Sequence, residues 1–151
     1  MAEYKSIKGF KTQSFATDPV ASQAAGGSWA SGGNLNDARS ELVGAGIQTA
    51  AMAYSGYTPA GASTTQSESY DGSAWTSTPT LNTPRYAGGG TGVQTAALMF
   101  GGETTPGGPG THTATEEWDG SAWTVGGAMN TGLRYRAGSG TVPAALAMGG
   151  N

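Results

Sequence analysis

Residues 67–76 read SESYDGSAWT, and residues 115–124 read TEEWDGSAWT. These near-copies belong to a longer repeat, because Trp29, Trp75 and Trp123 stand 46 and 48 residues apart. The same two spacings relate two further sets, which are Asn36, Asn82 and Asn130, and Gly56, Gly102 and Gly150. A fixed period of this length is typical of architectures in which each copy is one supersecondary unit. The sequence therefore predicts about three copies of one structural unit.

One copy of the repeat reads as four short β-strands. The apolar run 95–100 (TAALMF) is closed by two glycines, and short runs bounded by Gly are typical of buried strands. We expect two strands, Thr115 to Trp118 and Ala122 to Val125, to flank Asp119-Gly120, a pair suited to a tight hairpin turn. The stretch 85–92 supplies the fourth strand. Because each Gly disfavours a helix by about 1 kcal/mol, we expect an all-β fold of four-stranded antiparallel sheets.

The composition limits the classes of protein to which the chain can belong. It has 151 residues, 27 of them Gly, no Cys and a formal net charge of −3. Without Cys there is no disulfide framework and no sulfur-ligated metal. No apolar run of about 18 residues and no charged-then-apolar leader is present, so we expect neither a membrane span nor a Sec signal. Large apolar residues are few, and we therefore expect Trp75 and Trp123 to be structural core residues.

The first fifteen residues differ in character from the rest of the chain. All the lysines lie there, mixed with aromatic and aliphatic side chains. We expect residues 1–15 to form an arm that anchors the protein to a partner, and residues 16–151 to form the repeat region. The six residues expected to anchor the arm are Tyr4, Lys5, Ile7, Lys8, Phe10 and Lys11. Three lysines without an aromatic-and-arginine pattern do not indicate nucleic-acid binding.

The repeat resembles that of the kelch family. The shared features are an apolar strand closed by Gly, an aromatic-Asp pair, a Trp soon after it, and an Arg that opens each copy, namely Arg39, Arg85 and, with a one-residue slip, Arg134. In that family each copy is a four-stranded blade of a β-propeller, so the resemblance implies kelch-like blades over residues 24–151. Runs such as 28–36 (SWASGGNLN) and 46–57 (GIQTAAMAYSGY) are similar to Gly/Thr/Ala-rich kelch-like proteins of tailed bacteriophages. That similarity implies a structural protein of the virion.

The copies of the repeat are not all complete. If the strands of a blade are called A to D, the chain reads D at Trp29, two full copies ending at Trp75 and Trp123, and a final AB ending at Gly150. This is about three blades, whereas a propeller has four to eight. We expect the AB strands of one chain to complete the D strand of another copy, with a six-bladed dimer as the simplest closure. A larger ring, a threefold component with incomplete blades and a segment of a longer repeat array stay open.

The residue pattern does not predict an enzyme. His112 is the only His, and Asp71 and Asp119 lie in repeated turns. Catalysis needs an asymmetric set of groups that converge on one pocket, and a nitrogen-ligated metal site needs more than one His. We expect no catalytic residues, no metal site and no cofactor.

Two loops are the expected places for binding, because loops on a rigid scaffold commonly carry it. Residues 57–66 and 103–112 differ in sequence although their flanks repeat, and they are nearly uncharged, which suits a glycan or another protein. The candidate contacts are Tyr57, Thr58, Thr64, Thr104, Thr105 and His112. Two functions follow as hypotheses: a tail, adaptor or decoration protein of a phage virion attached through its arm, or a host receptor-binding or carbohydrate-binding adhesin. Tolerated loop variation without binding is equally open.

Overall fold

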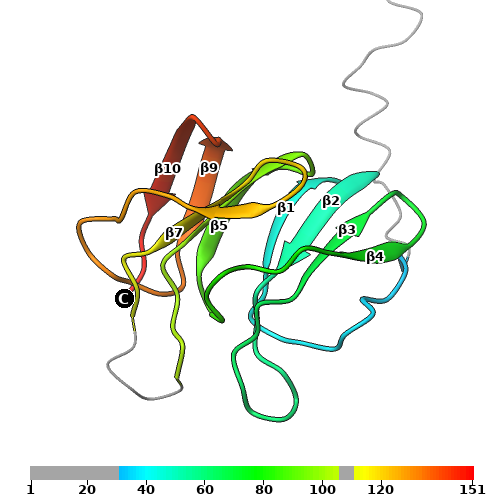
Figure 1. Cartoon of the computed structure of the whole chain (residues 1–151), viewed down its shortest axis with the longest axis horizontal. Helices are drawn as coiled ribbons and strands as arrows, with labels where there is room; N and C mark the ends of the chain where they lie inside the picture. Colours follow the sequence, from blue (N-terminus) through cyan, green and yellow to red (C-terminus); the bar gives the residue numbers. More distant parts are fainter. Residues whose placement is uncertain (1–30, 106–110) are drawn as a thin grey trace, which may run out of the picture. The chain divides into compact units, whose positions relative to one another are not determined.

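The computed structural model describes residues 31–105 and 111–151, and β-strands are the regular elements found there (Figure 1). Sheet 1 has the antiparallel order β1 (Val43–Ile47), β2 (Ala50–Tyr54), β3 (Ser67–Tyr70), β4 (Trp75–Thr78). Sheet 2 repeats it with β5 (Gly89–Val93), β6 (Ala96–Phe100), β7 (Thr115–Trp118) and β8 (Trp123–Val125). Sheet 3 pairs β9 (Ala137–Thr141) with β10 (Ala144–Met148). The prediction of an all-β fold with repeated four-stranded antiparallel sheets is confirmed.

Two of the predicted features lie outside the described residues. These are the arm 1–15, with its six anchoring residues, and the strand expected at Trp29. Completion of the sheets by another copy, and their membership of a propeller, stay predictions.

Each sheet opens with the same hairpin. The register pairs Ile47 with Ala50 in sheet 1, which leaves two residues in the turn. Gly46, which precedes the last residue of β1, has a φ of 108°, and a Cβ there would meet the carbonyl oxygen of Ala50. Gly92 and Gly140 hold the same place in sheets 2 and 3, with φ of 117° and 102°. The backbone of this hairpin thus requires a glycine at this position in all three sheets.

The Asp-Gly pairs lie, as predicted, in tight hairpin connections, which are four residues long, and Gly72 and Gly120 have positive φ values of 96° and 97°. β7 ends at Trp118 and β8 begins at Trp123. Between them the Asp119 carboxylate accepts hydrogen bonds from the backbone N–H and hydroxyl of Ser121, at 2.8 and 2.7 Å, and from the next backbone N–H. Asp71 accepts the same three bonds in sheet 1. Each Asp therefore shapes its turn by side-chain capping of the backbone.

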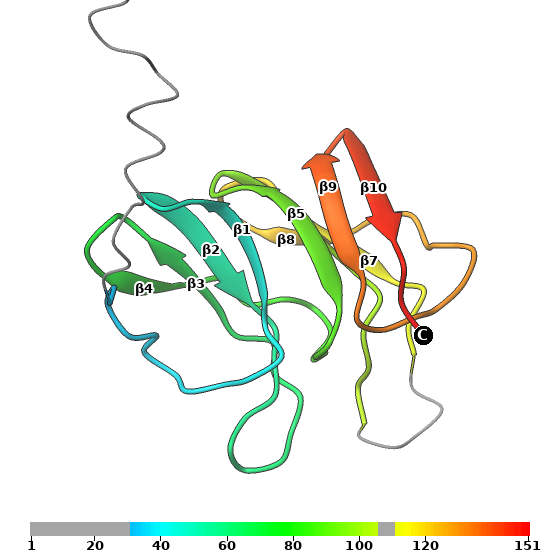
Figure 2. The same cartoon turned by 180° about the vertical axis from the view of Figure 1, so that it is seen from behind.

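The first strands of the three sheets lie side by side, because β5 contacts β1 on one side and β9 on the other (Figure 2). Backbone hydrogen bonds continue this contact, with Ala87 N–H donating to Glu41 C=O at 3.0 Å and Tyr135 N–H donating to Ala87 C=O at 2.6 Å. The buried apolar cluster belongs to sheets 1 and 2 and the segment between them, and comprises Val43, Met52, Tyr54, Leu81, Ala97, Met99, Trp118 and Trp123. Trp123 is buried as expected, whereas Trp75 is half-buried.

The structure corrects the alignment of the third copy. Gly56 N–H donates to the carbonyl of Arg85 at 2.9 Å, and Gly102 N–H donates in the same way to the carbonyl of Leu133 at 3.0 Å. Leu133 therefore takes the place of Arg85, at the 48-residue offset kept by the Trp and Asn markers. The predicted one-residue slip to Arg134 was wrong, because the backbone register defines the copies and the guanidinium of Arg134 does not follow it.

Candidate functional site

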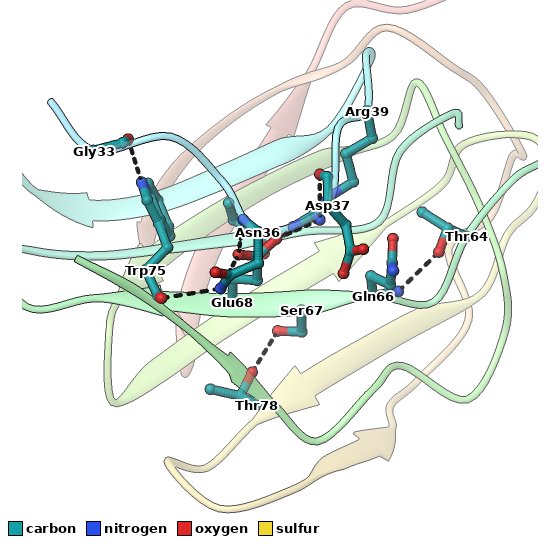
Figure 3. A network of polar contacts seen from close by, with 11 residues as sticks. Gly33, Asn36, Asp37, Arg39, Thr64, Gln66, Ser67, Glu68, Trp75 and Thr78 are labelled. Carbon is teal, nitrogen blue, oxygen red and sulfur yellow. Dashed lines mark hydrogen bonds and ion pairs between the residues drawn. The ribbon is translucent and has the colours of Figure 1, made fainter. Parts of the chain in front are cut away.

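A buried polar network joins the strands of sheet 1 (Figure 3). The Glu68 carboxylate on β3 pairs with the Arg39 guanidinium at 2.6 Å, and both side chains are shielded from solvent. The same carboxylate accepts hydrogen bonds from the backbone N–H and the side-chain amide of Asn36, at 2.8 and 2.9 Å. The Asn36 amide also donates to the carbonyl of Trp75 on β4 at 2.9 Å. One carboxylate thus ties the segment before β1 to β3, and the Asn36 amide extends the link to β4.

Sheet 2 repeats this network with the equivalent residues. Glu116 on β7 pairs with Arg85 at 2.7 Å, and the side chains are 1% and 0% exposed. Asn82 donates to Glu116 through its backbone N–H and its amide, at 2.6 and 3.0 Å, and to the carbonyl of Trp123 at 2.9 Å. The Asn, Arg and Trp of this network were repeat markers in the sequence, but the glutamates were missed as members. Their own 48-residue spacing was the signal that could have found them.

In the network, the ion-pair and hydrogen-bond partners act against the effect of burial on the charged groups. Burial raises the pKa of Glu68, but the hydrogen bonds from Asn36 and the Arg39 guanidinium outweigh it, and the pKa is lowered overall. Desolvation by burial is the main cause that lowers the pKa of Arg85, and Glu116 acts against it. Glu68 is therefore ionised at neutral pH with its partners already in place. Such a group links strands and is poorly suited to exchange protons.

The two predicted binding loops lie next to each other. The Ser63 hydroxyl of the first loop donates to the carbonyl of Thr104 in the second, at 2.9 Å. The ring of Tyr57, which is half-buried, packs against Tyr86 with centroids 5.0 Å apart. The described residues of the two loops are therefore in contact.

An asymmetric polar cluster includes Glu103, the first residue of the second loop, and was missed by the sequence reading. Glu103 accepts a hydrogen bond from the Tyr86 hydroxyl at 2.6 Å and pairs with Arg134 at 2.8 Å. The hydrogen bond from Tyr86 and then Arg134 lower the pKa of Glu103 against the effect of burial, whereas burial and the bond to Glu103 raise the pKa of Tyr86 to about 12. Sequence periodicity could not reveal this cluster, because Ser40 stands at the position of Tyr86 in the first copy.

The structure brings only some of the six predicted contacts together. Thr104 and His112 are neighbours, with 3.4 Å between Oγ1 and Nε2, and burial lowers the pKa of His112, so its ring is neutral at pH 7. The hydroxyls of Thr58 and Thr64 each accept a backbone hydrogen bond within their own loop, at 3.3 and 3.2 Å. Thr105 is exposed to solvent. Several of these polar groups are thus already engaged in ordering the loops.

A second surface feature lies at the opening hairpins, away from the predicted loops. It is an apolar depression of about 180 Å³ lined by Gly46, Ile47, Ala50, Val93, Gln94 and Thr95. Its lining contains no titratable side chain. Across residues 31–105 and 111–151 no group of three or more His, Cys, Asp or Glu is placed to hold a metal ion. Nor does that part of the chain contain a helix long and apolar enough to cross a membrane.

Comparison with known proteins identifies the fold. No family model matches the chain, and no curated protein matches it. A solved structure titled "Structure of YjhT" superposes with a TM-score of 0.64 at 14% sequence identity, covering 78% of this chain. The two proteins share a fold. The match covers 40% of the YjhT chain, so the present chain spans less than half of its length.

Proposed function

We propose that the chain is a non-enzymatic structural protein of a bacteriophage virion, in a tail, adaptor or decoration position, built of kelch-like propeller blades. The resemblance of the sequence to kelch-like proteins of tailed bacteriophages supports the proposal that the protein belongs to a virion. The main support for a structural role is that the buried charged side chains pair with one another and join strands. Arg39 with Glu68, and Arg85 with Glu116, are committed to joining strands in the same way in two successive sheets. Buried ion pairs used in this repeated manner suit a scaffold with one defined geometry.

Attachment to the particle is assigned to residues 1–15. The test compares purified particles that carry the full chain, a chain lacking residues 1–15, and the matched variant Lys5→Ala/Lys8→Ala/Lys11→Ala. We expect the truncation to abolish incorporation, measured by quantitative mass spectrometry, while circular dichroism of the isolated protein stays that of an all-β chain. The triple variant reports how much of the attachment is electrostatic. Absence of the full-length chain from the particles would refute the proposal.

A host-binding function is the alternative, and one observation favours it. The hydrogen bond between Ser63 and Thr104 joins two variable loops, and Tyr57 of the first loop packs on Tyr86. If these loops bind a glycan, Tyr57→Ala and Thr105→Ala reduce the signal on a glycan array. The control is Ile47→Thr, because Ile47 is exposed in the apolar depression of the opening hairpins. An array without signal for the unaltered protein would rule out carbohydrate adhesion, and equal losses in all three variants would rule out these loops.

A further inference from the structure

The outer edge of β10 lacks a neighbouring strand among the described residues. Its counterparts β2 and β6 are each followed in their sheets by a third strand, β3 and β7. Side chains of β10 are more exposed to solvent than their counterparts in sheet 2. Met148 on β10 is 42% exposed, whereas Phe100 at the same place on β6 is 2% exposed. An edge of this kind offers unpaired backbone groups and apolar surface to another strand.

The residue at position 133 restricts which strand can pair there. In sheets 1 and 2 the third strand carries a buried glutamate, Glu68 or Glu116, that an arginine neutralises. In sheet 3 Leu133 stands at the place of that arginine, as its backbone bond to Gly102 shows. A third strand with a glutamate at the repeated position would set its carboxylate against Leu133 in place of the guanidinium that it meets in sheets 1 and 2, and loss of that ion pair is unfavourable for a buried carboxylate. Sheet 3 therefore selects a strand that lacks this glutamate.

The sequence contains a segment with this property. Counting back 46 residues from Trp75 gives Trp29, and counting back 46 from Glu68 gives Ser22. Residues 16–31 thus keep the Trp of the repeat without its Glu. Sheet 3, in turn, keeps Asn130, the residue whose counterparts in sheets 1 and 2 donate to the Trp carbonyl at 2.9 Å. Both members of the ion pair are missing together, whereas both members of the Asn–Trp contact are retained.

We propose that the edge of β10 binds residues 16–31 of a second copy of this chain, with Ser22 opposite Leu133 and the Asn130 amide on the carbonyl of Trp29. A second copy is favoured over the same chain because Gly33, just after this segment, accepts a hydrogen bond from Trp75 at 3.0 Å. Trp75 begins β4, the last strand of sheet 1, and sheet 2 lies between sheets 1 and 3. This inference goes beyond the proposed function and does not depend on the particle.

The proposed contact between the uncharged residues Leu133 and Ser22 can be tested by charge complementation. The experiment uses two single variants, Leu133→Arg and Ser22→Glu. Each variant alone places an unpaired charge at every copy of the interface. In a 1:1 mixture, one kind of interface pairs the new Arg with the new Glu, and the other kind keeps Leu and Ser. We expect the unaltered chain to have the mass of an assembly by sedimentation velocity. Each variant alone should weaken assembly at least tenfold, and the mixture should restore it.

The controls separate this interface from a general effect of added charge and from poor folding. Val125→Arg adds the same charge at a side chain that is 70% exposed, and we expect it to leave assembly unchanged. A chain carrying both Leu133→Arg and Ser22→Glu keeps the proposal testable if a single variant folds poorly, because we expect it to assemble like the unaltered protein. A monomeric unaltered chain, or single variants that assemble normally, would overturn the proposal. Recovery in the doubly substituted chain without recovery in the mixture would show pairing within one chain, which overturns the second copy.

Discussion

Arg85 and Glu116 are joined at 2.7 Å between Nη2 and Oε1, and neither side chain is more than 1% exposed to solvent. The guanidinium also donates to the carbonyls of Gly101 and Ala114, at 3.0 and 2.8 Å. The pair therefore connects the segment before β5 to the end of β6, to β7 and to the residue that precedes β7. Sheet 2 is stabilised at its centre by one charge-neutral unit, so removing one half leaves the other charge buried without its partner.

The first prediction concerns this pair. Glu116→Ser and Arg85→Leu should each lower the free energy of unfolding by about 3–5 kcal/mol, because each leaves one buried charge without its partner. The double variant gives sheet 2 a Leu and a Ser at these positions, as at the equivalent positions 133 and 22. We expect its loss of unfolding free energy to be much smaller than the sum of the losses in the two single variants. Urea unfolding of the four proteins at one protein concentration measures the coupling. Strictly additive losses would contradict the assignment of the cost to an unpaired charge.

Ser55 offers a stabilising substitution. Its φ is 60°, and the same place after the second strand is held by Gly101 and Gly149, each with φ of 66°. Ser55 is fully buried and its hydroxyl has no hydrogen-bond partner. Ser55→Gly should raise the free energy of unfolding by about 1 kcal/mol, because it relieves both the left-handed backbone and the unpaired hydroxyl.

The reverse change is the matched control for that prediction. Gly101→Ser should destabilise the protein, because the φ of 66° is unfavourable for Ser and a Cβ would meet the carbonyl oxygen of Leu133. Thermal unfolding followed by circular dichroism compares the two variants. A destabilised Ser55→Gly protein would show that the Ser55 side chain makes a favourable contact beyond its backbone.

The sequence predicted strands better than it predicted the contacts between them. The bounds of β7, Thr115–Trp118, were predicted correctly, because β-formers, a turn and a repeated Trp act locally. The role of Glu116 was missed although the residue lies inside the quoted repeat, because its partner Arg85 is 31 residues away and burial of a charge is a tertiary property. Likewise Tyr86 and Glu103 come together only once the loops are placed, so no local pattern marks them.

Stability should fall in acid, because carboxyl groups of the folded protein have lowered pKa values. The hydrogen bonds from the Ala74 N–H and then from Ser73 lower the pKa of Asp71 from 3.8 to about 2, and the pKa of Glu68 is also lowered. A carboxyl with a lowered folded pKa contributes stability that is complete above its unfolded pKa and is lost as the pH falls through the folded value. We expect unfolding free energy to decline from about pH 4.5 toward pH 2.

Asp71→Asn tests the contribution of the turn to that decline. The amide oxygen can still accept hydrogen bonds, but it does not titrate, so the decline between pH 3.8 and about 2 should become shallower while the variant is less stable than the original protein at pH 7. Urea unfolding at a series of pH values gives both curves. Identical slopes in acid for the two proteins would contradict the assignment of this part of the decline to Asp71.

Trp75 and Trp123 hold one repeat position in different surroundings, and their replacement should differ in cost. The ring of Trp123 is buried against Tyr54 and Trp118, with centroids 4.8 and 5.6 Å apart, so Trp123→Ala should cost about 3–5 kcal/mol. Trp75 is half-buried against Tyr70 at 5.0 Å, and its removal should cost roughly half as much. Acrylamide quenching checks the environments, because Trp123→Ala removes a protected emitter and Trp75→Ala a more accessible one. Equal losses of stability would mean that Trp75 is covered in the assembled protein, which would itself locate a further contact on sheet 1.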